Sequence, residues 1–126
     1  MNLARLLIVA LGLGLALPAF ADGDPSKGKK VFRKCKACHT VGDKAKNKIG
    51  PILNGVVDRE IASVEGYKYS KPALAMKEEG FVWTVEALHA YLTKPKNVIK
   101  GGKMSFAGLR KEKDRADVIA YLQTFE

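Results

Sequence analysis

Apolar residues recur at helical spacing in several short stretches of this chain, and polar stretches rich in glycine separate them. The broadest apolar stripe predicts a helix from about Lys111 to Thr124; its members are Val118, Ile119, Tyr121, Leu122 and Phe125. A helix is also predicted from Asp24, an N-cap followed by proline, to about Cys38. Gly28 lies inside that helix, where glycine is less stable than alanine, so we expect another backbone to pass close to it.

Shorter helices are predicted between these two. One opens at Ser70 and is stopped by Gly80. The next is capped by Thr84 and is broken at Lys94-Pro95, where a further short turn begins and runs to Gly101-Gly102.

Residues 40–66 show no sustained hydrophobic period. They contain several turn-forming residues, namely Gly42, Gly50-Pro51, Gly55 and Gly66. Nothing in the chain alternates as a sheet would, so the pattern predicts an all-α domain made of several short helices and long loops. Loops of such length are usually functional or wrapped around something.

Residues 1–21 have the pattern of a cleavable secretory signal peptide. A short basic start with Arg5 precedes an apolar run from Leu6 to Leu17, and Pro18-Ala19-Phe20-Ala21 ends like a signal peptidase site. The apolar run is short for a membrane span, although an uncleaved anchor is the alternative. We therefore expect residues 22–126 to be the folded domain and the periplasm to be its location.

The chain is basic and long enough for one domain. Its 126 residues include 22 Lys and Arg against 13 Asp and Glu, a formal charge of +9, and Arg5 is the one charged residue within 1–21. Apolar residues interrupt every lysine cluster, which indicates faces of a folded domain. Basic charge is also typical of nucleic-acid binding, but no groove-reading or stacking motif is present, so we expect no nucleic-acid partner.

The chemistry is concentrated in Cys35-Lys36-Ala37-Cys38-His39-Thr40, which contains the C-x-x-C-H signature of covalent haem attachment. Two thiols bond to one porphyrin edge, and the histidine that follows is held beneath the iron. Three other interpretations compete: a thioredoxin-type dithiol, half of a zinc site, and a structural disulfide. No βαβ pattern precedes the motif, no further cysteine exists, and a disulfide across so short a loop would stabilise little.

A second axial ligand would decide what a bound haem does. The residues of suitable type are Met76, His89 and Met104. Met76 is on a short helix, where methionine usually fills a core. His89 lies near the edge of an apolar face, which favours a surface or boundary position. Met104 lies in an irregular stretch, where backbone can bring a thioether to a metal, and an open position is a further possibility.

Order and spacing of motifs along residues 24–125 resemble the class I cytochrome c family, of the bacterial c2 and mitochondrial type. The matching segments are Gly28-Lys29-Lys30-Val31-Phe32, the motif at 35–40, Gly50-Pro51-Ile52-Leu53-Asn54-Gly55, Gly66-Tyr67-Lys68-Tyr69-Ser70, Trp83, Tyr91-Leu92-Thr93-Lys94-Pro95-Lys96, Lys103-Met104-Ser105-Phe106-Ala107-Gly108-Leu109 and Asp117-Val118-Ile119-Ala120-Tyr121-Leu122. The resemblance implies the cytochrome c fold, in which long loops wrap around one covalent haem c and the N- and C-terminal helices pack together.

The resemblance also implies the residues that hold the cofactor. Cys35 and Cys38 correspond to the attachment residues, and His39 and Met104 to the iron ligands. Pro51 corresponds to the residue whose carbonyl accepts a hydrogen bond from the axial histidine.

Other cavity residues are implied in the same way. Tyr91 corresponds to the tyrosine beside the methionine sulfur, and Arg59, Tyr69 and Trp83 to groups that hold a buried propionate. The chain departs from mitochondrial members at Ile52, where they often have asparagine.

A six-coordinate haem implies a one-electron carrier rather than an enzyme, because no iron position is open to a substrate. A peroxidase or gas-binding protein is the main rival, and it would need Met104 displaced. The expected partners are membrane-bound redox complexes, such as a bc1-type complex and an oxidase or photosynthetic reaction centre, that dock a monomer through lysines around the haem edge. These lysines are Lys34, Lys36, Lys48, Lys94, Lys96, Lys100, Lys103 and Lys111.

Overall fold

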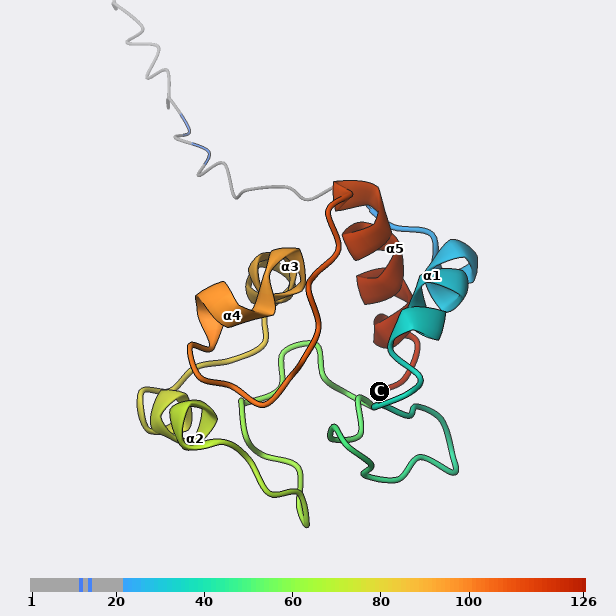
Figure 1. Cartoon of the computed structure of the whole chain (residues 1–126). Coiled ribbons are helices and arrows are strands. Elements are labelled where there is room, and N and C mark those ends of the chain that lie inside the picture. Colours follow the sequence, from blue (N-terminus) through green and yellow to red (C-terminus); the bar gives the residue numbers. More distant parts are fainter. Residues whose placement is uncertain (1–11, 13, 15–21) are drawn as a thin grey trace, which may run out of the picture.

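A computed structural model describes Gly12, Gly14 and residues 22–126, so the predicted signal peptide otherwise lies outside the described residues. The helices are α1 (Pro25–Val31), the 3-10 helix η1 (Phe32–Lys34), α2 (Lys71–Glu78), α3 (Val85–Thr93), α4 (Pro95–Val98) and α5 (Glu112–Gln123). No strand forms among the described residues, where an isolated antiparallel bridge joins Glu60 to Val82. The prediction of an all-α domain with long loops is confirmed (Figure 1).

Local capping decides where three of the helices begin. The side chain of Asp24 accepts hydrogen bonds from the backbone N–H groups of Ser26 and Lys27 at the start of α1. Ser70 and Thr84 cap α2 and α3 by accepting from the N–H group three residues later. These caps satisfy donors that a helix leaves unpaired in its first turn, so the sequence positions of the caps set the helix starts.

The first helix is shorter than the prediction. It ends as an α-helix at Val31, continues as η1, and passes into turns over residues 35–38. The N–H groups of Cys38 and His39 both donate to the carbonyl of Cys35, at 3.1 and 2.9 Å. The Cys38 bond spans three residues, as in a 3-10 turn, and the His39 bond spans four. The side chains of Cys35, Cys38 and His39 in this turn line one cavity.

The two terminal helices pack side by side, as Figure 1 shows. Gly28 of α1 lies against the backbone carbonyl of Asp117 in α5, and the rings of Phe32 and Tyr121 are 5.4 Å apart between centroids. The N–H of Asp24 donates to the carboxylate of Asp117 at 2.8 Å. This contact joins the two ends of the folded domain and confirms that a backbone passes close to Gly28.

Short backbone bridges anchor the loops to this helical frame. The N–H of Trp83 donates to the carbonyl of Arg59 at 2.8 Å, and the N–H of Leu109 donates to the carbonyl of Leu92 at 2.7 Å. The first bridge ties the 55–62 loop to the segment before α3, and the second ties the long loop after α4 to α3. Within the described residues, no helix has the length and apolar character that crossing a bilayer requires.

Gly28→Ala should lower the free energy of unfolding. A β-carbon at this position would overlap backbone atoms of Asp117, which cannot move aside as a side chain can. Overpacking costs about 1–3 kcal/mol, more than the roughly 1 kcal/mol that alanine gains over glycine in a helix. Thermal or denaturant unfolding should therefore show a net loss of up to about 2 kcal/mol in the free energy of unfolding. The exposed Lys29→Ala is the control in the same helix. An alanine variant at position 28 that is more stable than the native protein would contradict the contact.

Asp117→Asn should lower the free energy of unfolding at neutral pH, and the difference from the native protein should be smaller in acid. The N–H of Asp24 and the ammonium of Lys113 hold the pKa of Asp117 below its usual range. The carboxylate therefore contributes stability above the unfolded pKa of about 4, and that stability is lost as pH falls through the lower folded pKa. We expect unfolding experiments to show a loss of about 1.5–3 kcal/mol in the free energy of unfolding at pH 7, and a smaller loss toward pH 3. Asp43→Asn is the control, because Asp43 is exposed, and it should leave the free energy of unfolding unchanged at both pH values.

Candidate functional site

A cavity of about 390 Å³ opens between the 35–54 segment on one side and the 99–106 segment on the other. Each side chain that the sequence analysis assigned to a cofactor lines it. They are Cys35, Cys38, His39, Pro51, Arg59, Tyr69, Trp83, Tyr91 and Met104. The volume is typical of a small-molecule or cofactor site, and the walls are mostly apolar.

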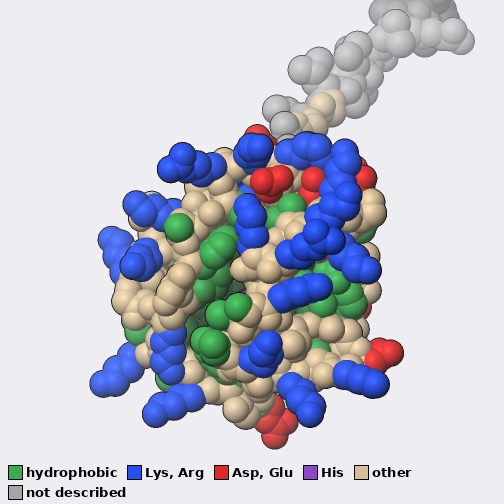
Figure 2. Space-filling model, turned by 45° about the vertical axis from the view of Figure 1, so that its right-hand side comes forward, with side chains coloured by type: hydrophobic (Ala, Val, Ile, Leu, Met, Phe, Trp, Pro, Cys, Tyr) green, Lys and Arg blue, Asp and Glu red, His purple; other side chains and the backbone are tan. Residues whose placement is uncertain are grey.

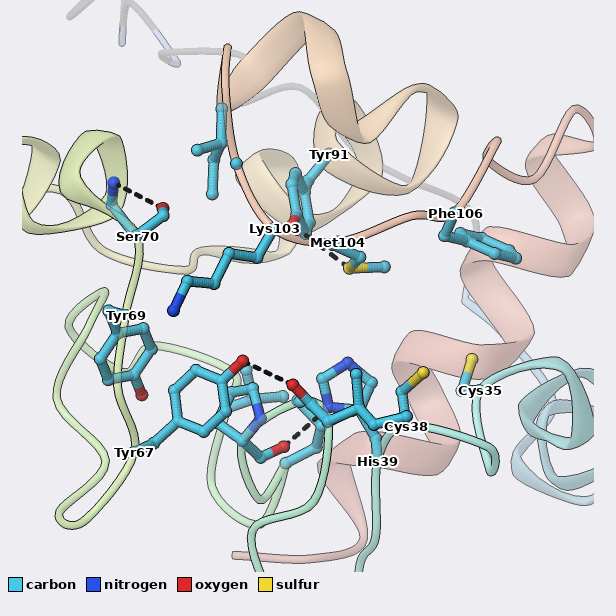
Figure 3. A pocket seen from close by; sticks show the side chains of 18 of the residues that line it. Cys35, Cys38, His39, Tyr67, Tyr69, Ser70, Tyr91, Lys103, Met104 and Phe106 are labelled. Carbon is cyan, nitrogen blue, oxygen red and sulfur yellow. Dashed lines mark hydrogen bonds between the residues drawn. The ribbon is translucent and has the colours of Figure 1, made fainter.

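The imidazole of His39 stands on one wall with its ring facing the cavity (Figure 3). Its Nδ1 lies 2.7 Å from the carbonyl oxygen of Pro51, a contact that requires the proton on Nδ1 and leaves the Nε2 lone pair free. Burial lowers the pKa of His39, which favours the neutral ring. A β-carbon on Gly50 would overlap this ring, so glycine lets the backbone approach it closely.

Cys35 and Cys38 line the cavity beside His39, and neither forms a disulfide. Burial and the neighbouring Cys38 raise the pKa of Cys35 to about 11, so its thiol stays protonated at neutral pH. A redox dithiol needs the opposite, a thiolate with a lowered pKa. Among the described residues, no group of three or more His, Cys, Asp or Glu side chains could hold a metal ion.

Met104 stands on the opposite wall, and its sulfur faces the ring of His39 across the cavity (Figure 3). The hydroxyl of Tyr91 in α3 donates to this sulfur at 3.2 Å. Burial raises the pKa of Tyr91 to about 12, so the hydroxyl keeps its proton and remains a donor. Lys103 ties the methionine segment to the 66–70 loop, because its ammonium donates to the carbonyl of Lys68 at 2.8 Å.

The other two candidate ligands lie outside the cavity lining. Met76 of α2 is partly buried and packs on the hydrophobic core. The prediction of a surface or boundary position for His89 was wrong, because its side chain is 5% exposed. α3 packs on α5, and charges of Arg115 and Glu112 in that helix act on the His89 ring. The periodicity of α3 alone could not reveal this second buried face.

Arg59 gives the cavity a half-buried positive corner. One guanidinium nitrogen donates to the carbonyls of Ile52 and Asn54, at 3.1 and 2.9 Å. Its Nε is buried without a hydrogen-bond partner, and no acidic side chain among the described residues pairs with Arg59. Desolvation lowers the pKa of this guanidinium. A half-buried cation with a buried, unused donor favours an anion, so this corner suits a ligand that brings its own carboxylate.

Two aromatic side chains complete that part of the cavity. The hydroxyl of Tyr69 accepts a hydrogen bond from the N–H of Val64 at 3.0 Å, which leaves its own proton available to another acceptor. Trp83 is 8% exposed and packs against Tyr91, with ring centroids 4.7 Å apart. The neutral imidazole, the two thiols, the thioether and the unpaired guanidinium donor together fit a haem with its propionates.

Sequence reasoning assigned no role to Tyr67, which lines the cavity, or to Asn47, which lies behind the segment that contains Pro51. The hydroxyl of Tyr67 donates to the carbonyl of Ile49 at 2.6 Å and closes the cavity rim. Asn47 joins the segment that contains Pro51 to the 63–67 loop through two hydrogen bonds. Tyr67 lies within a matching segment and could have been assigned from it, whereas no sequence signal distinguishes Asn47 from other loop asparagines.

Comparisons with known proteins agree on one family. The family model described as "Cytochrome c" matches residues 25–126. Cytochrome c-550 of Ancylobacter novellus is 52% identical over 101 residues, covering 80% of this chain and 94% of that protein. Cytochrome c2 of Rhodomicrobium vannielii is 44% identical over 124 residues, covering 98% and 97%. The structure of cytochrome c2 from Rhodospirillum centenum superposes with a TM-score of 0.77 at 42% identity, covering 82% of this chain and 98% of that one.

Cys38→Ala should reduce the stable attachment of haem. One of the two thiols that line the cavity beside His39 would be lost, and with it one of the expected covalent bonds. The measurement is the mass of the denatured protein after expression with haem-attachment machinery. Lys36→Ala changes an exposed residue between the cysteines and should leave the haem increment intact. A fully loaded, normally folded Cys38→Ala protein would show that this thiol is not used.

Proposed function

The chain belongs to the cytochrome c family, and from that membership we propose that it is a periplasmic carrier whose haem iron is held between His39 and Met104. It is an electron-transfer cytochrome with one covalently bound haem c. The proposal depends above all on one observation, the two potential iron ligands that face each other across a single cavity with the cysteine pair beside them.

His39 has the form that an iron ligand needs. Its ring is neutral, and its free Nε2 points into the cavity while Nδ1 is held by the carbonyl of Pro51. Such a bond fixes the orientation of the ring and makes the nitrogen on the other side a better donor. We assign attachment to Cys35 and Cys38, which are half-buried and line the cavity beside His39.

Met104 and Tyr91 determine how the second axial position behaves. A thioether favours the ferrous state, and the Tyr91 hydroxyl withdraws further electron density from the sulfur. If His39 and Met104 hold the iron in this way, they would leave no open position for oxygen or peroxide. The bound haem supplies one reversible one-electron couple, and the protein keeps the ligands of that couple in place.

Arg59, Tyr69 and Trp83 have a different task in this proposal. We assign them to the haem propionates, because Arg59 lacks an acidic partner and Tyr69 has a free hydroxyl proton. Trp83 supplies a buried aromatic wall next to them. The positive charge of Arg59 would also make reduction of the iron more favourable.

The surface around the cavity suits transient docking on acidic partners. Figure 2 shows a hollow lined by hydrophobic side chains with Lys and Arg side chains around it. All eight lysines named from the sequence are exposed, and Lys34 and Lys103 contribute to the cavity lining itself. Such a ring attracts acidic surfaces and raises association rates, most strongly at low salt. A bc1-type complex and an oxidase or photosynthetic reaction centre are the partners we propose for a monomer.

The proposed location rests on the N-terminal sequence. Residues 1–21 have the three-part pattern of a signal peptide, and the alignment with the Rhodomicrobium vannielii cytochrome covers 98% of this chain, so it extends into them. Covalent attachment of haem to this motif outside the cytoplasm is consistent with export.

Met104→Ala should lower the reduction potential and open the iron to small ligands. Axial ligands span a range of roughly 0.8 V, so loss of the thioether should shift a redox titration by about 0.1 V or more. The variant should also bind carbon monoxide or cyanide readily, whereas the native protein should not. Met76→Ala, which removes a methionine outside the cavity lining, is the control and should leave both properties unchanged.

An unchanged potential in Met104→Ala would place the second ligand elsewhere. Ready binding of carbon monoxide by the native protein would favour a sensor or peroxidase instead of a carrier.

A further inference from the structure

One peptide group separates the axial histidine from a side chain that has no contact with the cavity. The carbonyl of Pro51 accepts the hydrogen bond from His39 Nδ1 at 2.7 Å. The N–H of the same peptide group, that of Ile52, donates to Asn47 Oδ1 at 3.0 Å. The described chain has no cis peptide bond, so this C=O and N–H point in opposite directions. His39 and Asn47 therefore form hydrogen bonds with opposite sides of the same planar peptide group.

Asn47 is itself fixed from a second direction. Its Nδ2 donates to the carbonyl of Glu65 at 3.1 Å, which lies 18 residues further along the chain. The side-chain oxygen of Asn47 therefore binds the Pro51–Ile52 peptide, and its side-chain nitrogen binds the 63–67 loop. The side chain is half-buried, so water competes less with these bonds than at an open surface. Rotation of the peptide would break the bonds to His39 and Asn47 together.

Hydrogen bonds at the two ends of a peptide reinforce each other. When the N–H donates, the amide polarises and its carbonyl becomes a stronger acceptor, by about 10–30% per bond in condensed-phase estimates. A stronger acceptor at Pro51 draws the Nδ1 proton and leaves more electron density on Nε2 of His39. More density at an axial nitrogen favours the ferric state, and so lowers the potential.

We propose that Asn47 is a positioning residue for the axial histidine, acting through the Pro51–Ile52 peptide to hold the reduction potential lower than it would otherwise be. This rests on the proposed function, because it takes His39 as an iron ligand. The Ile52 side chain plays no part in the mechanism, since only its backbone N–H is used.

The chain provides a matched control in Asn54. Its side chain also makes one accepted and one donated hydrogen bond to backbone, both with Gly42 at 3.0 Å. Asn47→Ala and Asn54→Ala therefore remove the same chemical groups from the same region, but the first alone touches the peptide that binds His39. Both variants should lose stability on thermal unfolding.

Redox titration of the haem-loaded proteins should separate the two variants. We expect a raised potential in Asn47→Ala and an unchanged one in Asn54→Ala. In Asn47→Ala, amide exchange at Ile52 should also be faster and the His39 Nδ1 proton signal should move. Equal shifts in the two variants would mean general loosening and would overturn the proposal, as would an unchanged potential in Asn47→Ala.

Asn47→Asp tests the same point if the alanine variant folds poorly. A carboxylate keeps the acceptor for the Ile52 N–H but loses the donor to Glu65, so the potential should stay level or fall while stability drops. A rise like that expected for alanine would overturn the proposal. The wild-type and Met104→Ala titrations test the ligation independently, so an error there is distinguishable from an error about Asn47.

Discussion

The close approach of α1 and α5 is the contact on which the remaining structure depends. It is possible because Gly28 has no side chain to meet the carbonyl of Asp117, and the carboxylate of Asp117 also binds the backbone at Asp24. A domain with loops as long as 35–70 and 99–111 has little regular structure elsewhere to hold its shape. Once the terminal helices are joined, one end of each loop is fixed, because 35–70 begins directly after η1 and 99–111 ends directly before α5. The cavity lies between these two loops.

The two walls of the cavity are held by different means. On the His39 wall, backbone and side-chain hydrogen bonds converge on one short turn, in which Gly50 donates to the carbonyl of Cys38 and the hydroxyl of Tyr67 donates to Ile49. On the Met104 wall, an irregular segment is held by fewer bonds, chiefly from Tyr91 and Lys103. A ligand that reaches both walls would therefore join a wall held by many hydrogen bonds to one held by few.

Charge is divided between an inner and an outer set with separate physical roles. Arg59 is partly buried without an acidic partner, where low dielectric makes its charge act strongly on a nearby anion. The exposed lysines are screened by salt, and in the proposed docking they would act at longer range on an approaching partner. Reduction of the iron and the encounter with a redox partner can therefore be tuned by different residues.

The sequence alone determined the helix starts, the cysteine motif and the family, because caps, helical periodicity and motif spacing are local properties of the chain. Local patterns could not place Met104 opposite His39, since residues 65 positions apart meet only after folding. The bonds of Asn47 and the burial of His89 were also decided by tertiary structure: each depends on a neighbouring segment, the 63–67 loop in one case and α5 in the other. An isolated stripe or loop carries no information about what will pack against it.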